Sequence, residues 1–402
     1  MRSLKYIVLM TAVAGCSSET QVTQPDASLA RSTAAVQYQV VKLPSLGGTL
    51  SRGMAINTQG WVAGWSNQSD GTRRAALWQG GSILGLGTLG GPNSTVPWQG
   101  LNNHGMVIGI SQTAEVDSLD EDWSCEAGAF LAGPTNLICR GFVWQNGLMR
   151  ELPTLGGNHG FATGVNNQGQ VVGWAETPLR DPTCTGVQVL QFRAVIWEPK
   201  TRKIETRELS PYPGDSTSAA TAINNRGQAV GISGDCDQAV GRFSARHAVL
   251  WNGNGSVAKL PNLGGETWHT PMDINEDGDV VGFSNPPGAG DPEGDFISHA
   301  FLVMHGSPTA VDLQTLPGDL FSEAFAINSR RQIVGVSFGG ANGSHAFLYE
   351  NGVMKDLNTI FPIGNDVFQS AQDINDAGQI TGRVLDRTTG QTLTFIATPI
   401  PH

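Results

Sequence analysis

The sequence is poor in charged residues and has no basic run. Charged residues make up 15% of the 402 residues, and Asp and Glu outnumber Lys and Arg by 35 to 24, so the formal net charge is −11. Nucleic-acid binding typically relies on a basic patch or stripe. We therefore expect no nucleic-acid partner, and a surface suited to solubility in a salty exterior or to cationic partners.

The sequence also lacks an apolar run long enough to span a bilayer as a helix. Its first apolar run, residues 6–14, follows two basic residues and is typical of a signal peptide. The run ends in Val-Ala-Gly-Cys at 13–16, which resembles a bacterial lipobox. By this resemblance residues 1–15 are a lipoprotein signal peptide and Cys16 carries the lipid. An ordinary signal peptide with a chance cysteine is the alternative.

The segment after the lipobox is small, polar and aperiodic. We expect residues 16–36 to be a lipidated cysteine and a flexible tether. Ser17 is not the aspartate that retains lipoproteins at the inner membrane, so the resemblance favours the outer membrane or the cell surface. The folded domain is expected at 37–402, membrane-anchored through Cys16 and monomeric.

Cysteine is scarce, with only four residues beyond Cys16. An even number of cysteines in an exported chain permits disulfides, and no Cys-x-x-Cys spacing suggests zinc. A Cys125–Cys139 bridge would close one long loop, and a Cys184–Cys236 bridge would join neighbouring repeats. Four cysteines allow three connectivities, so these pairings are hypotheses.

Glycine, in contrast, is abundant, at 52 residues, and it recurs in a repeat. Each copy has a small residue or Asp, then an aliphatic residue, Asn, two variable residues, usually Gly, two or three apolar-leaning residues and a final Gly. Asn and the final Gly occur in every copy, and the middle Gly is replaced only by Arg331. The copies lie at 55–64, 100–109, 164–173, 222–231, 273–282, 326–335 and 373–382.

The repeat predicts a β-hairpin at each asparagine. Asn at the first position and Gly at the fourth are preferred in a type I turn, and β-prone residues flank them. A Leu-Gly-Gly-like segment precedes most hairpins and an aromatic strand such as RAALWQ (74–79) follows, so each unit carries four short strands. The 45–64-residue interval between asparagines suits a four-stranded propeller blade.

The two ends of the repeat region are complementary. It begins with a fourth-type strand at 38–48 that has no unit before it, and it ends with a third-type strand at 394–399 that has no fourth strand after it. Pairing these ends would remove exposed sheet edges. We therefore predict an all-β, seven-bladed β-propeller of four-stranded blades, closed by the N-terminal strand. An open β-solenoid is the alternative.

The repeat resembles the extracellular HAF-type repeat family. The resemblance rests on His-Ala-Phe at 299–301 and 345–347 and on Leu-Gly-Gly before the hairpins, and it covers about residues 38–400. The family comprises exported repeat proteins without an assigned reaction. The resemblance thus implies location and architecture and no chemistry.

One face of the predicted propeller carries the loops of variable length, which are where function usually resides. These loops hold aromatic and acidic residues. The aromatic side chains either stack on a glycan or peptide or cover the ends of the blade cores. The candidate ligand-binding residues are Trp98, Trp123, His159, Phe161, Trp268, His269, Phe321 and Phe368.

These observations favour a binding module over an enzyme. The sequence contains no His-x-x-x-His spacing and no phosphate-loop signature. We expect the domain to bind an envelope or extracellular protein, peptide or glycan. A propeller glycoside hydrolase or lyase with an acidic funnel is one alternative, which a close pair of carboxylates would favour. A structural spacer in a surface assembly is another.

Two sets of polar residues resemble metal sites. Asp273, Asn275, Asp277 and Asp279 alternate as in a calcium loop, but Ser284 stands at the twelfth position and the shared turn explains Asn275. Calcium therefore stays a weak alternative, and we expect no cofactor. Three histidines at corresponding positions of successive units are expected to bond neighbouring strands: His247, His299 and His345.

Overall fold

Antiparallel β-strands in groups of four build almost all of the protein. The computed structural model describes residues 36–121, 135–184, 187–200, 203–237, 241–288, 296–341, 343–361 and 364–400. Residues 37–402 form one unit. Cys16, Trp123 and Cys125 lie outside the described residues. Within the described ranges, α2 (Leu357–Ile360) is the single α-helix, and no helix has the length and apolarity to cross a membrane.

Five separate sheets each contain four strands in chain order. The first two comprise β6 (Gly90–Thr95), β7 (Val107–Val116), β8 (Leu137–Gln145) and β9 (Leu148–Glu151), then β10 (Gly160–Val165), β11 (Val171–Arg180), β12 (Leu190–Pro199) and β13 (Ile204–Leu209). The other three comprise β14 (Thr217–Ile223), β15 (Ala229–Gly234), β16 (His247–Trp251) and β17 (Val257–Lys259), then β18 (Thr270–Ile274), β19 (Val280–Ser284), β20 (His299–Val303) and β21 (Val311–Asp312), then β22 (Phe321–Ile327), β23 (Ile333–Gly340), β24 (Gly343–Glu350) and β25 (Val353–Asp356).

The remaining eight strands form one sheet made of two groups. A single parallel pair, Leu50 with Thr392, links the groups. One group comprises β2 (Gly47–Ile56), β3 (Val62–Gln68), β4 (Arg73–Gln79) and β5 (Ser82–Gly85), and the other comprises β26 (Val367–Ile374), β27 (Ile380–Asp386), β28 (Gln391–Pro399) and β1 (Tyr38–Lys42). The predicted pairing of the first strand with the last is confirmed, because β1 pairs with β28 from Tyr38↔Pro399 to Lys42↔Phe395.

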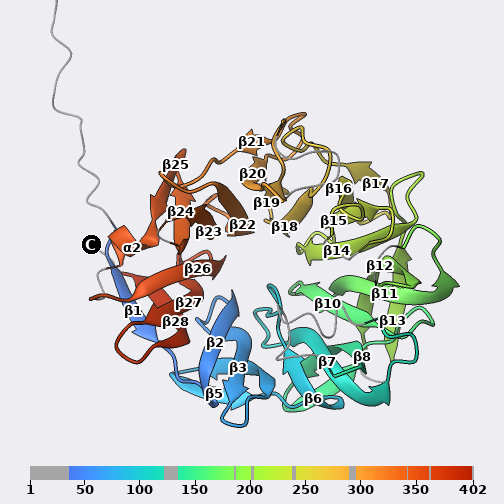
Figure 1. Cartoon of the computed structure of the whole chain (residues 1–402), viewed down its shortest axis with the longest axis horizontal. Coiled ribbons are helices and arrows are strands. Elements are labelled where there is room, and N and C mark those ends of the chain that lie inside the picture. The colour runs from blue at the N-terminus through green and yellow to red at the C-terminus, as the bar shows by residue number, and fades with distance from the viewer. Residues whose placement is uncertain are drawn as a thin grey trace, which may run out of the picture. The chain divides into compact units, whose positions relative to one another are not determined.

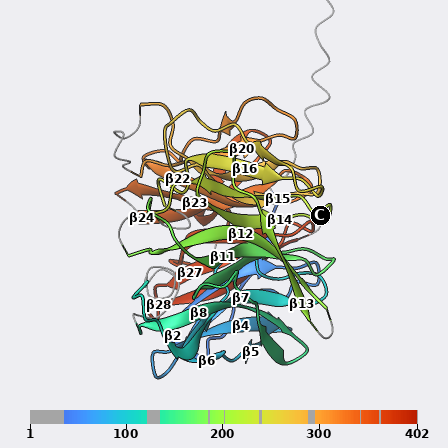
Figure 2. The same cartoon turned by 90° about the vertical axis from the view of Figure 1, so that its right-hand side faces the viewer.

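The groups are arranged around a common centre. Figure 1 shows β10, β14, β18, β22 and β26 beside the centre, and β13, β17 and β25 at the periphery. Figure 2 shows the same groups from the side. The prediction of an all-β, propeller-like fold built of four-stranded units is thus confirmed.

The predicted type I turn is confirmed at every repeated asparagine. In the first copy, the N–H of Gly60 donates to the carbonyl of Asn57 at 3.0 Å, and Gly60 has a φ of +73°. Asn57 Oδ1 also accepts the N–H groups of Gln59 and Trp61. The fourth turn residue therefore needs a left-handed backbone, which glycine adopts at little cost.

The repeated asparagines also bond one another, and we call this hydrogen-bonded circle the asparagine ring. Each Nδ2 donates to the backbone carbonyl of the next asparagine, at 2.9–3.3 Å, and Asn375 donates to Asn57. None of these side chains is more than 7% exposed. Only an amide supplies both the acceptor for its own turn and the donor for its neighbour. Its members are Asn57, Asn102, Asn166, Asn224, Asn275, Asn328 and Asn375.

The final glycine of each copy is required by space. A Cβ on Gly173 would lie 1.9 Å from the carbonyl oxygen of Phe161 on the paired strand. The same contact, at 1.9–2.2 Å, recurs with the corresponding carbonyl in every copy. Any side chain would therefore push the first and second strands of its group apart.

Buried tryptophans join neighbouring groups. Trp197 is fully buried on β12, and its Nε1 donates to the carbonyl of Pro153, which follows β9 of the preceding group. Trp78 and Trp251 make equivalent bonds. The three strand-start histidines also bond neighbouring segments as predicted, since each Nδ1 contacts an aspartate: Asp215 for His247, Asp312 for His299 and Asp356 for His345.

Candidate ligand-binding site

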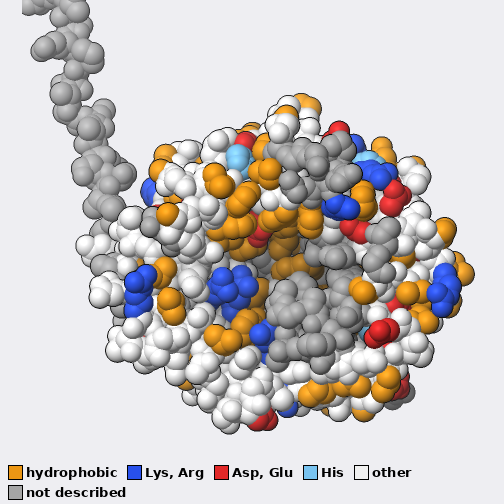
Figure 3. Space-filling model, viewed as in Figure 1, with side chains coloured by type: hydrophobic (Ala, Val, Ile, Leu, Met, Phe, Trp, Pro, Cys, Tyr) orange, Lys and Arg blue, Asp and Glu red, His pale blue; other side chains and the backbone are white. Residues whose placement is uncertain are grey.

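A cavity of about 180 Å³ lies where four groups meet. Its polar walls come from Arg52, Glu323 and Gln372, and Trp98 and Phe325 supply much of its apolar wall. All of them except Trp98 stand five or three positions before a ring asparagine, on the first strand of their group. This is the predicted loop face. Figure 3 shows hydrophobic side chains and charges of both signs around a hollow at the centre of one face.

Opposite charges enter this cavity from two groups. Arg52 lies on β2 and Glu323 on β22, and both side chains are half-buried. Burial lowers the pKa of Arg52 to about 9, and the nearby charge of Arg383 also lowers it, whereas that of Glu323 raises it. Burial raises the pKa of Glu323 to about 7, and Arg52 opposes this shift. Glu323 can therefore exchange a proton near neutral pH.

Several polar atoms of the cavity residues have no partner within the described part of the chain: Nε of Arg52, Oγ1 of Thr95 and Nε2 of Gln372. Thr95 is 0% exposed and Gln372 is 3% exposed, so bulk water does not readily satisfy them. Gln99 reaches across to the sixth repeat, where its Nε2 donates to the carbonyl of Phe325 at 2.5 Å. Native proteins pair most buried polar groups. This concentration of unpaired polar groups makes the cavity the candidate binding site.

Two half-buried aspartates occupy the small-residue position of the repeat in the fifth and seventh copies. Asp373 Oδ2 accepts the N–H of Ile56 at 2.7 Å, and Asp273 Oδ2 accepts that of Ile327 at 2.9 Å. Burial raises the pKa of Asp373 to about 8, with a contribution from the charge of Asp273, whose own pKa burial raises to about 6. These carboxyl groups join neighbouring groups through the backbone.

Three predicted residues border one apolar cluster next to the cavity. Trp98 and Trp268 are half-buried and pack against the cluster that contains Phe325, although they come from different groups. Phe321 contacts Phe338 of the same cluster, with ring centroids 5.3 Å apart. Trp98 also lines the cavity itself. These three positions stay candidates for ligand contact.

Four other predicted residues are buried, and the expectation that they present a binding surface is wrong. His159, Phe161, His269 and Phe368 are each no more than 2% exposed. Phe161 packs behind Trp98, with centroids 5.8 Å apart. Burial lowers the pKa of His269 to about 4, and Phe368 belongs to the core beneath β1. Loop aromatics at these positions cover the ends of the groups.

His159 takes part in a buried network with Asp117 and Glu121. Their side-chain ligand atoms lie within 4.8 Å of one another. The Nδ1 of His159 accepts the backbone N–H of Cys139 at 3.1 Å, so its proton resides on Nε2, which faces Asp117 Oδ2 at 3.2 Å. A metal on Nε2 would require the proton on Nδ1, against the Cys139 N–H. The network therefore orders the loops and does not form a metal site.

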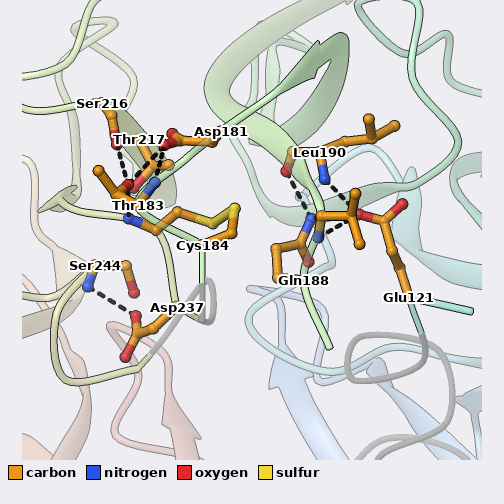
Figure 4. The surroundings of a disulfide bond; sticks show 12 residues. Glu121, Asp181, Thr183, Cys184, Gln188, Leu190, Ser216, Thr217, Asp237 and Ser244 are labelled. Carbon is orange, nitrogen blue, oxygen red and sulfur yellow. Dashed lines mark hydrogen bonds between the residues drawn. A yellow bond between two sulfur atoms is a disulfide. The ribbon is translucent and has the colours of Figure 1, made fainter. Parts of the chain in front are cut away.

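The predicted Cys184–Cys236 disulfide is confirmed, and it joins two neighbouring groups. Figure 4 shows it beside Asp181. The side-chain ligand atoms of Asp181, Cys184 and Cys236 lie within 4.8 Å of one another. They do not form a metal site, because sulfur atoms in a disulfide are not thiolate ligands. Cys139 is also disulfide-bonded, whereas Cys125, its predicted partner, lies outside the described residues.

Two of the three carboxylates of the weak calcium candidate, those of Asp273 and Asp279, have protein partners. Asp279 is 0% exposed, and its Oδ2 lies 2.6 Å from Nε of Arg331 in the next copy. Burial raises the pKa of Asp279, but the hydrogen bonds from Arg331 and His305 and the charge of Arg331 together outweigh it and hold that pKa below its usual value. Asp273 bonds two backbone N–H groups and Asp277 is exposed. Asp279, an acidic residue found only in the fifth copy, therefore pairs with Arg331, which replaces the middle glycine in the sixth copy.

We expect this pair to be coupled energetically. Arg331 has a φ of +58°, so Arg331→Gly relieves backbone strain of about 1 kcal/mol but leaves Asp279 buried without its cation. The net loss of stability is expected to be about 1–2 kcal/mol. Asp279→Gln introduces the residue found there in copies three, four, six and seven, so Asp279→Gln/Arg331→Gly is expected to match the wild type. Chemical denaturation of all four proteins measures the coupling, and additive effects would contradict it.

Two other cavities are less suited to selective binding. One of about 200 Å³ lies among the asparagine turns, where backbone N–H groups and side chains bond across neighbouring copies. Another of about 440 Å³ lies beside the β8–β9 hairpin, whose Leu148 is 63% exposed. Neither is lined by a side-chain polar atom that is buried and unpaired among the described residues.

Sequence reasoning missed the cavity residues Arg52, Gln372 and Phe325 as candidates. They stand on first strands, where the repeat predicts structural residues. A signal was present, because the residues five positions before the ring asparagines differ in every copy although the rest of the motif recurs. They are Arg52, Pro97, Phe161, Ala219, Thr270, Glu323 and Ser370.

Comparisons with known proteins indicate fold and no more. No protein-family model and no curated protein matches the sequence. A streptogramin B lyase structure is similar over 90% of this chain and 98% of that chain, at 12% identity and a TM-score of 0.46. An acylaminoacyl peptidase from Pyrococcus horikoshii covers 90% and 54%, at 10% identity and a TM-score of 0.47. A Trypanosoma rangeli sialidase covers 90% and 59%, at 10% identity and a TM-score of 0.38.

Proposed function

We propose that residues 37–402 form a closed, seven-bladed propeller. The asparagine ring supports this, since its last member bonds its first across most of the chain. The pairing of β1 with β28 supports it too, because it supplies the final four-strand group from the two ends of the chain. Such closure covers the edges that would otherwise pair with other chains.

The propeller acts as an exported binding module, anchored to the outer membrane or cell surface through Cys16. The Cys184–Cys236 disulfide supports an oxidising location. The cavity supports binding, because it combines an aromatic wall with unpaired buried polar groups. The observation that carries this proposal is the unpaired state of Thr95 and Gln372 at that cavity. The ligand class is a glycan or a peptide of an envelope or extracellular partner.

A glycan and peptide array probed with the purified full chain tests this function. We expect selective binding that Glu323→Gln weakens at least about tenfold, because the substitution removes the charge and keeps the shape. Glu208→Gln, on exposed β13, is the matched control and should bind as the wild type does. Selective binding that is equal in all three proteins would place the ligand elsewhere, and absence of selective binding would favour a spacer role.

A hydrolase or lyase is a second candidate function, and the raised pKa of Glu323 favours it. A carboxyl group with a pKa of about 7 suits general acid or base catalysis. The cavity does not provide a carboxylate pair, since Glu323 is the one acid among its nine described lining residues. Turnover of an array ligand by the wild type, abolished in Glu323→Gln, would establish the enzyme. Intact ligand after prolonged incubation would leave binding as the function.

A further inference from the structure

Arg52 lines the cavity in a chain of net charge −11, and Arg383 of another group lies near it. Arg52 Nη2 donates to Ser370 Oγ at 3.4 Å. Ser370 stands directly opposite Arg383 in the β26–β27 register, so these two side chains lie on the same face of their sheet. Two guanidinium groups from different groups of strands therefore approach the same region. The charge of Arg383 lowers the pKa of Arg52, in line with this placement.

Neither arginine is fully paired within the described part of the chain. The Nε of Arg52 and the Nε of Arg383 lack hydrogen-bond partners there. The Nε2 of Gln372 provides another unpaired donor at the cavity. Guanidinium groups bind carboxylates through paired N–H donors. The chain as a whole is acidic and repels anions. Binding of an anion at the cavity therefore depends on the unpaired N–H donors of Arg52 and Gln372.

The other residues that line the cavity indicate which chemical groups the rest of the ligand carries. Thr95, Glu323 and Gln372 offer hydroxyl, carboxyl and amide groups from three different groups of strands, and Trp98 offers an aromatic wall. A sugar ring presents hydroxyls around its circumference and an apolar face, which suits this distribution. A peptide C-terminus presents its polar atoms on one side. The volume of about 180 Å³ limits the occupant to one small unit of a longer molecule.

We propose that the cavity binds a uronate unit of an acidic oligosaccharide, with its carboxylate at Arg52, on the side nearest Arg383, and its hydroxyls at Thr95, Glu323 and Gln372. This inference rests on the proposed binding function and specifies the ligand class of that same site. It also assigns a specificity role to Arg52. A neutral sugar of the same shape would leave the arginine donors unpaired, and its affinity would suffer accordingly.

Titration calorimetry of the full chain with uronate oligosaccharides and their methyl esters tests the inference, because esterification removes the charge and adds only a methyl group. We expect the acid to bind at least about tenfold more tightly than its ester. Arg52→Gln should weaken acid binding at least about tenfold and ester binding less than about threefold. Arg52→Lys should recover part of the loss, and Arg207→Gln, exposed on β13, should change nothing. Unchanged melting temperatures show that the variants are folded.

Three outcomes would overturn the uronate inference. They are equal binding of acid and ester, binding that Arg52→Gln leaves intact, and preference for peptides with a free C-terminal carboxylate. The proposed function survives if neutral sugars or peptides bind and Glu323→Gln weakens them. Both proposals fall if no sugar or peptide responds to Arg52→Gln or to Glu323→Gln.

Discussion

Gly173→Ala is expected to cost about 4 kcal/mol of stability or more, and to leave little folded protein at 37 °C. The new methyl group would lie 1.9 Å from the carbonyl oxygen of Phe161 and 3.0 Å from the Cα of Ala162. Both atoms belong to the backbone of the paired strand, so no side-chain rotation relieves the clash. The β10–β11 ladder must separate locally, and its hydrogen bonds are lost with it. Urea denaturation followed by circular dichroism measures the change.

Gly253→Ala is the control for this experiment. Gly253 is not left-handed, and a Cβ there would approach no atom more closely than 3.5 Å. Its stability should stay within about 0.5 kcal/mol of the wild type. Equal stabilities of the two variants would show that the recurrent final glycine has no steric role.

Asn224→Asp is expected to cost about 3 kcal/mol at neutral pH. The substitution keeps the oxygen that accepts the N–H groups of Arg226 and Gln228. It removes the Nδ2 donor to the carbonyl of Asn275, at 3.1 Å, and places a buried negative charge against that carbonyl. The loss should decrease as the pH falls below the pKa of the new carboxyl, because the protonated group again has a donor. Denaturation of wild type and variant at matched pH values measures the difference.

Asn254→Asp is the matched control for the ring variant. Asn254 is exposed in the β16–β17 hairpin, and its Oδ1 accepts from Ser256, a role that aspartate keeps. We expect a change within about 0.5 kcal/mol. Asn375→Asp extends the experiment to the bond that joins the last repeat to the first. A negligible loss at Asn375 would argue against closure of the ring in solution.

Much of the fold was predictable because its signals are local. A type I turn is specified by a few residues, and alternating apolar residues specify the strands on either side of it. The complementary ends of the repeat region predicted the pairing of residues 38–42 with 395–399, which the structure has. The Cys184–Cys236 pairing followed from the same repeat map. Repetition made each of these signals stronger than any single copy.

The binding site was predicted less well, for a physical reason. Trp98 and Phe161 are both aromatic, and both lie four or five positions before the repeated asparagine of their unit. Trp98 is half-buried and lines the cavity, whereas Phe161 is buried behind Trp98. This difference depends on how neighbouring groups pack, which no local pattern encodes. Arg52 and Glu323 are 271 residues apart in the chain, so their opposition at one cavity depends on the ring arrangement.

The sequence by itself determined the turn, the strand order and the number of repeats, since these rest on short-range preferences of asparagine, glycine and β-prone residues. The tertiary structure decided why the asparagine and the final glycine recur. The asparagine donates to the next repeat and the glycine lies against a carbonyl of the paired strand. It also decided that Asp279 pairs with Arg331 and that Arg52, Glu323 and Gln372 share a cavity. Contacts between repeats depend on the arrangement of the groups around their centre, and only the folded chain supplies that arrangement.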